Sequence, residues 1–376
     1  MKTVSHISRI LLGITFVFSG FVKGIDPWGS AYKFTDYLNA MGMEWLVWAA
    51  FPMGVLLSLA EFTIGVALLF NLFSRLFSLF ALLFMAFFLP FTLWIAIKNP
   101  VTDCGCFGDA LILSNWETFY KNVVLTVFAI IVFATRKKMK SIFNIKFNMI
   151  LGGVFMVTYM FLVYYSYNHL PIFDFRPYKI GTNIPESMII PKGAKQDVYE
   201  NIFYYKNKNT GDIKKFSEDD YPWQDTTNWE FSDIKSSLVE KGYRPPIHDF
   251  TIETLDGDDI SGYFLSDDNF VFILVAHDLH KSSLKPQQKI NEMSNWALKN
   301  GLSFICLTST PFYESQVFAI ENGAYYEFFN CDEITLKTII RSNPGLVVIK
   351  GGTILGKWHY NDIPSPDEFK NKFMNK

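Results

Sequence analysis

The sequence predicts an α-helical membrane bundle followed by a water-soluble α/β domain. Half of its 376 residues are hydrophobic, and long apolar runs follow one another from residue 4 to about residue 167. From Pro171 onward the composition is that of an ordinary soluble protein, and from Pro246 strand patterns alternate with helix patterns. Such alternation is typical of a mixed sheet with helices on both faces. A chain of this length also predicts more than one domain.

Five apolar segments are long enough to cross a bilayer, whose hydrocarbon core of about 30 Å takes roughly 20 helical residues. The first follows a lysine, as the core of a signal peptide does, but no small-x-small cleavage site comes after it, so we expect a retained signal anchor. Between the first two segments, residues 28–43 fit either a short amphipathic helix in the interface or a connecting loop with aromatic anchors. The five segments cover residues 7–22, 45–70, 75–97, 119–135 and 147–167.

The distribution of basic residues predicts the orientation of these spans, because short loops rich in Lys and Arg stay in the cytoplasm. We therefore expect a multi-pass protein of the inner membrane, with a cytoplasmic N-terminus and a periplasmic C-terminal half. Its immediate partner is the lipid bilayer, and a net charge of −2 with no basic stripe argues against nucleic acid. The basic residues at the cytoplasmic ends are Lys2, Arg9, Arg75, Arg136, Lys137, Lys138, Lys140 and Lys146.

The loop between the third and fourth spans carries a pair of cysteines in the run Asp103-Cys104-Gly105-Cys106-Phe107-Gly108-Asp109. A disulfide between them would close a very small ring, which makes a poor structural staple and an easily reduced bond. The glycine between them can take the backbone angles that let the two sulfurs meet. The two aspartates disfavour a thiolate, and Lys98 alone favours one. Cys104 and Cys106 are thus the candidate redox pair, on the side where disulfides persist.

Glu61 is the acidic residue that lies well inside a predicted span. A charge at that depth is costly, so it normally faces the bundle interior and has a partner. By depth, the candidate partners are Lys23, Arg9 and Arg75. Glu61 is either a proton-relay or quinone-site residue or a structural polar contact, and the sequence leaves both open.

Residues 1–135 resemble the DoxX and MauE superfamily of small polytopic membrane proteins. The resemblance implies a four-helix core and a role in disulfide formation or delivery, which MauE-like proteins are associated with in methylamine utilisation. That core is also similar to vitamin K epoxide reductase, which passes electrons from thiols to a quinone, so the resemblance implies a quinone as cofactor. With its added parts, the chain looks like the fused DoxX proteins of Bacteroidetes. The resemblance rests on Arg9 to Lys23, Asp26-Pro27, Glu61 to Gly65 and the cysteine loop.

The last 130 residues resemble the thioredoxin-like fold, in its peroxiredoxin and thiol-reductase branch. In that resemblance Pro344 is the cis-proline, and the strand at residues 270–276 leads into the active site. Where a family member has Cys-x-x-Cys, this chain reads His277-Asp278-Leu279-His280. We therefore expect no thiol chemistry from this domain, and an exposed loop in preference to a metal site at the two histidines.

These observations divide the chain into four parts: a DoxX/MauE-like four-helix transmembrane domain at 1–140, a fifth transmembrane helix at 141–170, a periplasmic connecting subdomain with a β-hairpin at 171–245, and a thioredoxin-like domain without Cys-x-x-Cys at 246–376. The sequence favours a membrane thiol-disulfide redox or disulfide-maturation factor that exchanges electrons with a separate periplasmic protein. The alternative is a non-catalytic membrane scaffold whose thioredoxin-like domain binds an envelope partner.

Overall fold

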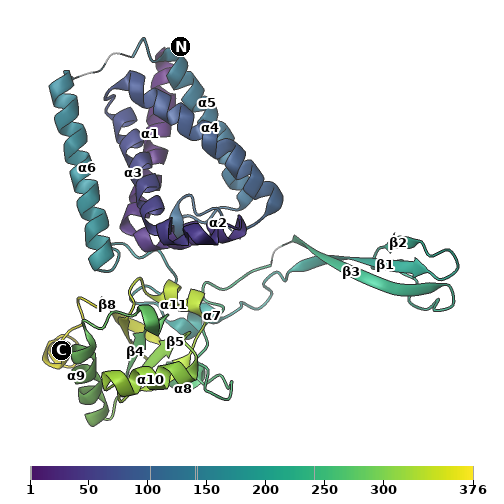
Figure 1. The fold of residues 1–376 in the computed structure, drawn as a ribbon, viewed down its shortest axis with the longest axis vertical. Helices are drawn as coiled ribbons and strands as arrows, with labels where there is room; N and C mark the ends of the chain where they lie inside the picture. The colour runs from purple at the N-terminus through teal and green to yellow at the C-terminus, as the bar shows by residue number, and fades with distance from the viewer. Residues whose placement is uncertain (1, 102, 140, 142, 241, 376) are drawn as a thin grey trace. The chain divides into compact units, whose positions relative to one another are not determined.

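The computed structural model describes residues 2–101, 103–139, 141, 143–240 and 242–375, so Lys140 of the predicted cytoplasmic cluster lies outside the described residues. The chain forms two compact units (Figure 1). The first combines Met1–Thr182 with Phe250–Lys376, and the second is Asn183–Asp249. Because the first unit holds both the long helices and the α/β domain, it carries the features that matter for function.

The five predicted membrane spans are confirmed as five helices long and apolar enough to cross a membrane. The first extends three residues beyond its predicted end, and the second is preceded by a 3-10 turn, η1 (Glu44–Ala49). The protein is therefore a multi-pass helical membrane protein. Its spanning helices are α1 (Lys2–Ile25), α3 (Ala50–Leu69), α4 (Ser74–Lys98), α5 (Asn115–Thr135) and α6 (Ile145–Asn168).

Glycines let α1 and α3 pack backbone against backbone. A Cβ added at Gly20 would lie 2.6 Å from the backbone nitrogen of Phe62, and one added at Gly65 would lie 2.5 Å from that of Val17. Neither position can hold a side chain without moving a helix, and small residues at helix interfaces are how membrane helices approach closely. This contact brings the polar residues of α1 beside Glu61 on α3.

The segment after α1 is a helix, α2 (Pro27–Ala40), and not a plain loop. Asp26 caps it by accepting a hydrogen bond from the backbone nitrogen of Gly29 at 2.9 Å, and Pro27 supplies the fixed φ that suits the first helical position. The helix thus begins where the sequence has its Asp-Pro pair.

The α/β domain contains a five-stranded sheet in the order β6-β5-β4-β7-β8, with β4, β5 and β6 parallel and β7 and β8 antiparallel to their neighbours. A β-α-β unit followed by a hairpin and a last helix, with a cis peptide at Asn343-Pro344, matches the predicted thioredoxin-like arrangement. The elements are α8 (Ser261–Leu265), β4 (Phe270–Val275), η3 (Leu279–Lys281), α9 (Gln287–Lys299), β5 (Ser303–Thr308), α10 (Phe312–Asn322), β6 (Glu327–Asn330), α11 (Glu333–Ile339), β7 (Gly345–Lys350), β8 (Thr353–His359) and α12 (Pro366–Phe373).

The second unit is a three-stranded antiparallel sheet in the order β2-β1-β3, preceded by the short helix α7 (Ile184–Met188). The predicted hairpin is present, with β1 (Val198–Asn207) paired to β2 (Ile213–Phe216) so that Phe203 faces Phe216. The third strand, β3 (Trp229–Glu240), was missed because its sequence is mostly polar.

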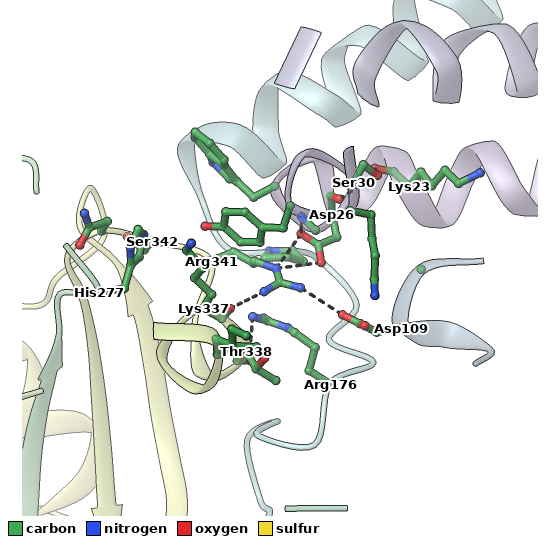
Figure 2. A pocket seen from close by; sticks show the side chains of 18 of the residues that line it. Lys23, Asp26, Ser30, Asp109, Arg176, His277, Lys337, Thr338, Arg341 and Ser342 are labelled. Carbon is green, nitrogen blue, oxygen red and sulfur yellow. Dashed lines mark hydrogen bonds and ion pairs between the residues drawn. The ribbon is translucent and has the colours of Figure 1, made fainter. Parts of the chain in front are cut away.

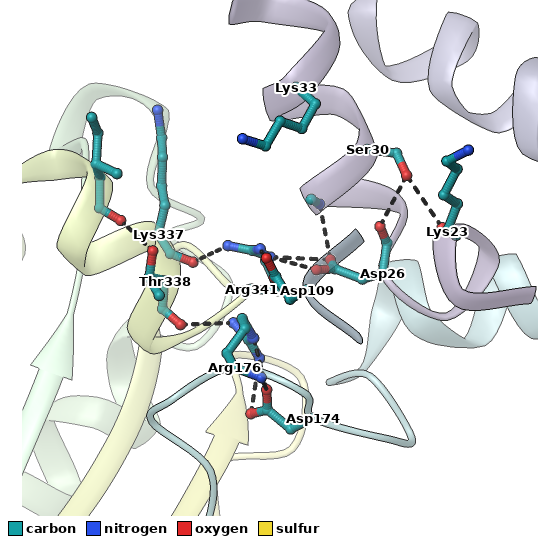
Figure 3. Close-up of polar contacts among 12 residues, drawn as sticks. Lys23, Asp26, Ser30, Lys33, Asp109, Asp174, Arg176, Lys337, Thr338 and Arg341 are labelled. Atoms are coloured by element: carbon teal, nitrogen blue, oxygen red, sulfur yellow. Dashed lines mark hydrogen bonds and ion pairs between the residues drawn. The ribbon is translucent and has the colours of Figure 1, made fainter. Parts of the chain in front are cut away.

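Arg341, which follows α11, binds the α/β domain to the helical part of the same unit (Figure 3). Its Nε donates to both carboxylate oxygens of Asp26 at 3.0 Å, and its Nη2 donates to Asp109 Oδ2 at 3.1 Å. The guanidinium also lies 5.3 Å from the centre of the Tyr32 ring. The Arg341 side chain is only 7% exposed, and the two carboxylates raise its pKa although burial alone would lower it. One buried cation therefore neutralises carboxylates from two separate parts of the helical region.

Replacing Arg341 by Ala should weaken this attachment strongly. Removing one partner of a buried ion pair leaves an uncompensated charge and costs about 3–5 kcal/mol. We expect R341A to lower the thermal unfolding temperature in detergent and to speed proteolytic cleavage of the segment at residues 169–182. The matched control is R244A, because the Arg244 side chain is 54% exposed and only 3.8 Å from its carboxylate. Equal behaviour of the two variants would contradict the assignment.

Candidate functional site: a thiol pair between two cavities

The cysteine loop is a tight turn that brings both thiols to one side. Asp103 Oδ1 accepts a hydrogen bond from the backbone nitrogen of Gly105 at 3.0 Å, and Gly105 has a φ of +64°, a conformation that favours glycine. The Sγ atoms of Cys104 and Cys106 lie 3.2 Å apart, and both cysteines are free thiols. The structure therefore brings together the two predicted site residues that form the candidate redox pair.

Side chains from α1 and α2 hold the backbone of this loop. The Tyr37 hydroxyl donates to the carbonyl oxygen of Cys104 at 2.7 Å, and the Ser19 hydroxyl lies 2.7 Å from the carbonyl oxygen of Cys106. Lys33 Nζ forms an ion pair with Asp103 at 2.8 Å. Each cysteine thus has its own polar anchor, and the loop cannot shift without breaking contacts to two helices.

Glu61, the third predicted site residue, lies in a buried cluster next to this loop. Of its three candidate partners, Lys23 is the one that binds it, with Nζ 2.8 Å from both carboxylate oxygens. Arg9 instead donates to the carbonyl oxygen of Leu68 at 2.8 Å. Depth in the membrane alone could not separate these partners, whereas the close contact of α1 with α3 does.

Ser19 connects the ion pair to the redox loop. Its Oγ lies 3.0 Å from Lys23 Nζ, 2.9 Å from Glu61 Oε2 and 2.7 Å from the Cys106 carbonyl oxygen. A hydroxyl has one proton to donate, and an ionised carboxylate and a carbonyl both only accept. The Ser19 proton must therefore serve either Glu61 or the Cys106 carbonyl, so the position of a proton at the ion pair is felt by the cysteine loop. The signal available in the sequence was the spacing of four residues between Ser19 and Lys23, which places both on one helix face.

The two thiols have opposite electrostatic environments. The pKa of Cys106 is lowered to about 6, chiefly by the hydrogen bond with the Cys104 thiol and also by the positive charges of Lys121 and Lys23. The same hydrogen bond, together with burial, raises the pKa of Cys104. Cys106 is thus the thiolate of the pair.

The expectation that Lys98 alone would favour a thiolate is wrong. The cations that act on Cys106 are Lys121 and Lys23, which come from α5 and α1. The aspartates that were expected to disfavour a thiolate are themselves paired, Asp103 with Lys33 and Asp109 with Arg341. The sequence showed which charges were near in the chain, but not which helices face the loop.

The loop separates two cavities of different character. The first, of about 680 Å³, is mainly apolar and aromatic and is lined by both cysteines together with Lys23, Glu61 and Lys121. Its other lining residues come mostly from α1 to α5 and include Phe16, Phe34, Tyr37, Met53, Phe84, Phe88 and Phe91.

The second cavity, of about 800 Å³, lies between the helical region and the α/β domain and is rich in charged and polar side chains (Figure 2). We call it the polar chamber. Gly105, Gly108 and Asp109 line it from the cysteine loop, and His277, Ser342 and Asn343 line it from the α/β domain. Gly105 lines both cavities. The same loop therefore presents its sulfurs to one cavity and its glycine backbone to the other.

The two histidines that stand in place of Cys-x-x-Cys have separate surroundings. His277 lines the polar chamber, where burial lowers its pKa to about 4 and keeps it neutral at physiological pH. His280 is exposed, with Nε2 2.7 Å from Glu314 Oε2. Among the described residues, no group of three or more His, Cys, Asp or Glu side chains is placed to hold a metal ion.

The fold and the site together define a multi-pass helical membrane protein with a soluble α/β domain and a thiol pair where the two meet. Residues 1–135 match the family model described as methylamine utilisation protein MauE. Residues 199–241 match a model described as a domain of unknown function, DUF8463. A solution structure of a proposed protein disulfide isomerase from Bacteroides thetaiotaomicron is similar over 33% of this chain and 80% of its own, with 18% identity and a TM-score of 0.26. No curated protein matches the chain.

Removing the Cys104 thiol should change how Cys106 reacts with pH. With its pKa lowered to about 6, Cys106 in the reduced protein is a thiolate above that pH and a thiol below it. C104A removes the hydrogen bond, so we expect the midpoint of alkylation to rise toward the ordinary cysteine value of about 8.5. The measurement is the rate of iodoacetamide modification of Cys106 against pH, read by peptide mass. An unchanged midpoint in C104A would show that the thiol pair does not set this pKa.

The Lys23–Glu61 pair should behave as a coupled unit. K23M alone leaves a buried carboxylate unpaired and should cost about 3–5 kcal/mol, and E61L alone leaves a buried ammonium with a similar cost. The double variant K23M/E61L removes both charges, so we expect it to unfold at a higher temperature than either single variant. Thermal unfolding in detergent measures all four proteins. Additive losses in the double variant would contradict a direct pair.

Proposed function

We propose that this protein is a membrane thiol-disulfide oxidoreductase whose Cys104 and Cys106 alternate between dithiol and disulfide. The observation that carries the proposal is the position of the pair, with its sulfur atoms 3.2 Å apart at the wall of an apolar cavity. A low pKa at one thiol and a high pKa at the other support the same assignment. Reactive cysteines have such thiolate-favouring surroundings, whereas structural buried cysteines are inert.

The unequal thiols give the exchange a direction. A donor thiolate attacks Sγ of Cys104 in the oxidised pair, a donor–Cys104 disulfide forms, and Cys106 leaves as the thiolate. Leaving is faster for the thiol of lower pKa, which is Cys106. A second donor thiolate then attacks the donor sulfur and releases Cys104. The donor becomes a disulfide, and the pair becomes a dithiol carrying two electrons.

A quinone is the acceptor that the apolar cavity suits best. Its volume of about 680 Å³ is in the usual range for small-molecule sites, and its lining combines aromatic side chains with a few polar groups. In the balanced reaction, the dithiol forms its disulfide and the quinone takes up two electrons and two protons to become the hydroquinone. Glu61, joined to the loop through Ser19, is the proposed proton relay.

The donor is proposed to be a periplasmic protein, with the chain held in the inner membrane and its N-terminus in the cytoplasm. The clusters of Lys and Arg at one set of helix ends support this orientation. It places the thiol pair and the α/β domain on the oxidising side.

A non-catalytic scaffold is the second candidate, and a specific feature favours it. The α/β domain has His277 and His280 where a thiol-active relative would have cysteines, so it keeps the fold without that chemistry. In this case the Cys104–Cys106 pair is a permanent disulfide, and the domain binds an envelope partner.

The redox state of the pair in cells separates the two candidates. Thiols are blocked with an alkylating reagent at lysis, and the mass of the peptide that contains Cys104 and Cys106 is compared with and without depletion of quinone. We expect the dithiol to accumulate when quinone is removed, because the pair can still receive electrons but cannot pass them on. Cys306 and Cys331, which are free and buried in the α/β domain, serve as internal controls that should not respond.

A pair that stays fully oxidised in both conditions would contradict the oxidoreductase and favour the scaffold. The variant E61Q refines the test, since it keeps the side-chain volume but removes the ionisable group. We expect slower re-oxidation of the pair in E61Q, with a pH profile that differs from that of the wild-type protein.

A further inference from the structure

The polar chamber has a place in the proposed reaction that the apolar cavity cannot take. The sulfurs line the apolar cavity, whereas the chamber meets the loop at Gly105, Gly108 and Asp109. Gly105 is the residue common to both, and it has no side chain to separate them. The wall between the chamber and the thiols is therefore thinnest at Gly105.

The charged groups around the chamber are already paired with one another. Lys337 binds Glu333 at 2.6 Å, Lys33 binds Asp103 at 2.8 Å, and Arg341 binds both Asp26 and Asp109. An anionic ligand would have to compete with these carboxylates for each cation. The lining is thus poorly suited to a charged small molecule.

The chamber does offer neutral polar atoms. Within the part of the chain that the structure describes, the buried His277 Nδ1 and Asn343 Oδ1 have no hydrogen-bond partner, and both residues line the chamber. Buried polar atoms normally have partners, so each such pair of unused groups needs an explanation. A neutral imidazole nitrogen and an amide oxygen are suited to the N–H and C=O groups of a polypeptide main chain.

The chamber exists because Arg341 attaches the α/β domain to the cysteine loop and to the N-terminus of α2. One wall belongs to the loop and the other to a domain that has no thiols at positions 277 and 280. A domain placed in this way can hold a substrate against the loop without taking part in the electron transfer.

We propose that the polar chamber binds an extended polypeptide segment that carries the donor thiol, and that it presents this thiol to Cys104 and Cys106 across Gly105. The inference rests on the proposed function and names the substrate class and the binding site of its donor half-reaction. Donor and acceptor then reach the pair from opposite sides of one loop, the peptide from the chamber and the quinone from the apolar cavity.

The test compares two thiol probes on the reduced, full-length protein in detergent. The first is a short peptide whose single cysteine is activated as a 2-pyridyl disulfide, and the second is the small lipophilic reagent 2,2′-dithiodipyridine. With either probe, the Cys106 thiolate attacks a probe sulfur, a mixed disulfide forms, and pyridine-2-thione leaves and is followed by its absorbance. The mixed disulfide is then resolved by Cys104.

A tryptophan placed in the chamber should affect only the peptide probe. Ser283 lines the chamber and makes no side-chain hydrogen bond that shapes the loop, so S283W fills the chamber from the α/β domain. We expect S283W to slow the peptide probe by about tenfold or more, equivalent to about 1.4 kcal/mol, and to leave the small probe unaffected. The matched control is S266W, because Ser266 is exposed and does not line the chamber.

A second variant, H277A, removes a proposed main-chain contact without filling the chamber. We expect it to raise the peptide concentration needed for half-maximal rate and to leave the small probe unchanged. Equal rates for S283W and the wild-type protein with the peptide, or equal slowing with both probes, would overturn the proposal. These rates do not depend on re-oxidation, so a pair that proves static in cells contradicts the proposed function without deciding the outcome of this test.

Discussion

The buried ion pair between Lys23 and Glu61 is the interaction on which the arrangement of the site depends. A carboxylate inside a membrane span needs a cation at hydrogen-bond distance, and here the cation comes from a helix that contacts its neighbour through glycine. That requirement fixes the depth and rotation of α1 against α3. Ser19, one turn before Lys23, is then placed against the Cys106 carbonyl. The redox loop is thereby positioned by a charge that lies outside it.

The cysteine loop lies at a boundary between two kinds of surroundings. On one side, apolar and aromatic side chains exclude water and strengthen the influence of nearby charges on the thiols. On the other side, paired charges and neutral polar groups form a wetter surface. A two-residue separation of the cysteines suits this boundary, because a short rigid turn exposes sulfur on one face and backbone on the other.

Hydropathy was sufficient to predict the five spans, because lipid leaves a continuous apolar record in the sequence. The alternation of elements was sufficient for the α/β domain. The contacts that make the site were not predictable in the same way: Lys121 is fifteen residues from Cys106 along the chain, and Arg341 is more than two hundred from Asp109. Their pairing depends on which helix faces face each other. The strand β3 was missed for a different reason, since its exposed polar residues carry no hydrophobic alternation.

Asp26 caps α2 through the Gly29 backbone and also binds Arg341. The two roles require different things of one side chain. Asparagine could cap the helix but has no charge to offer the guanidinium, and glutamate has the charge but is a poorer cap. Natural variation at this position should therefore be narrow, and a change there should be accompanied by a change at Arg341. Position 26 thus links the evolution of the membrane helices to that of the soluble domain.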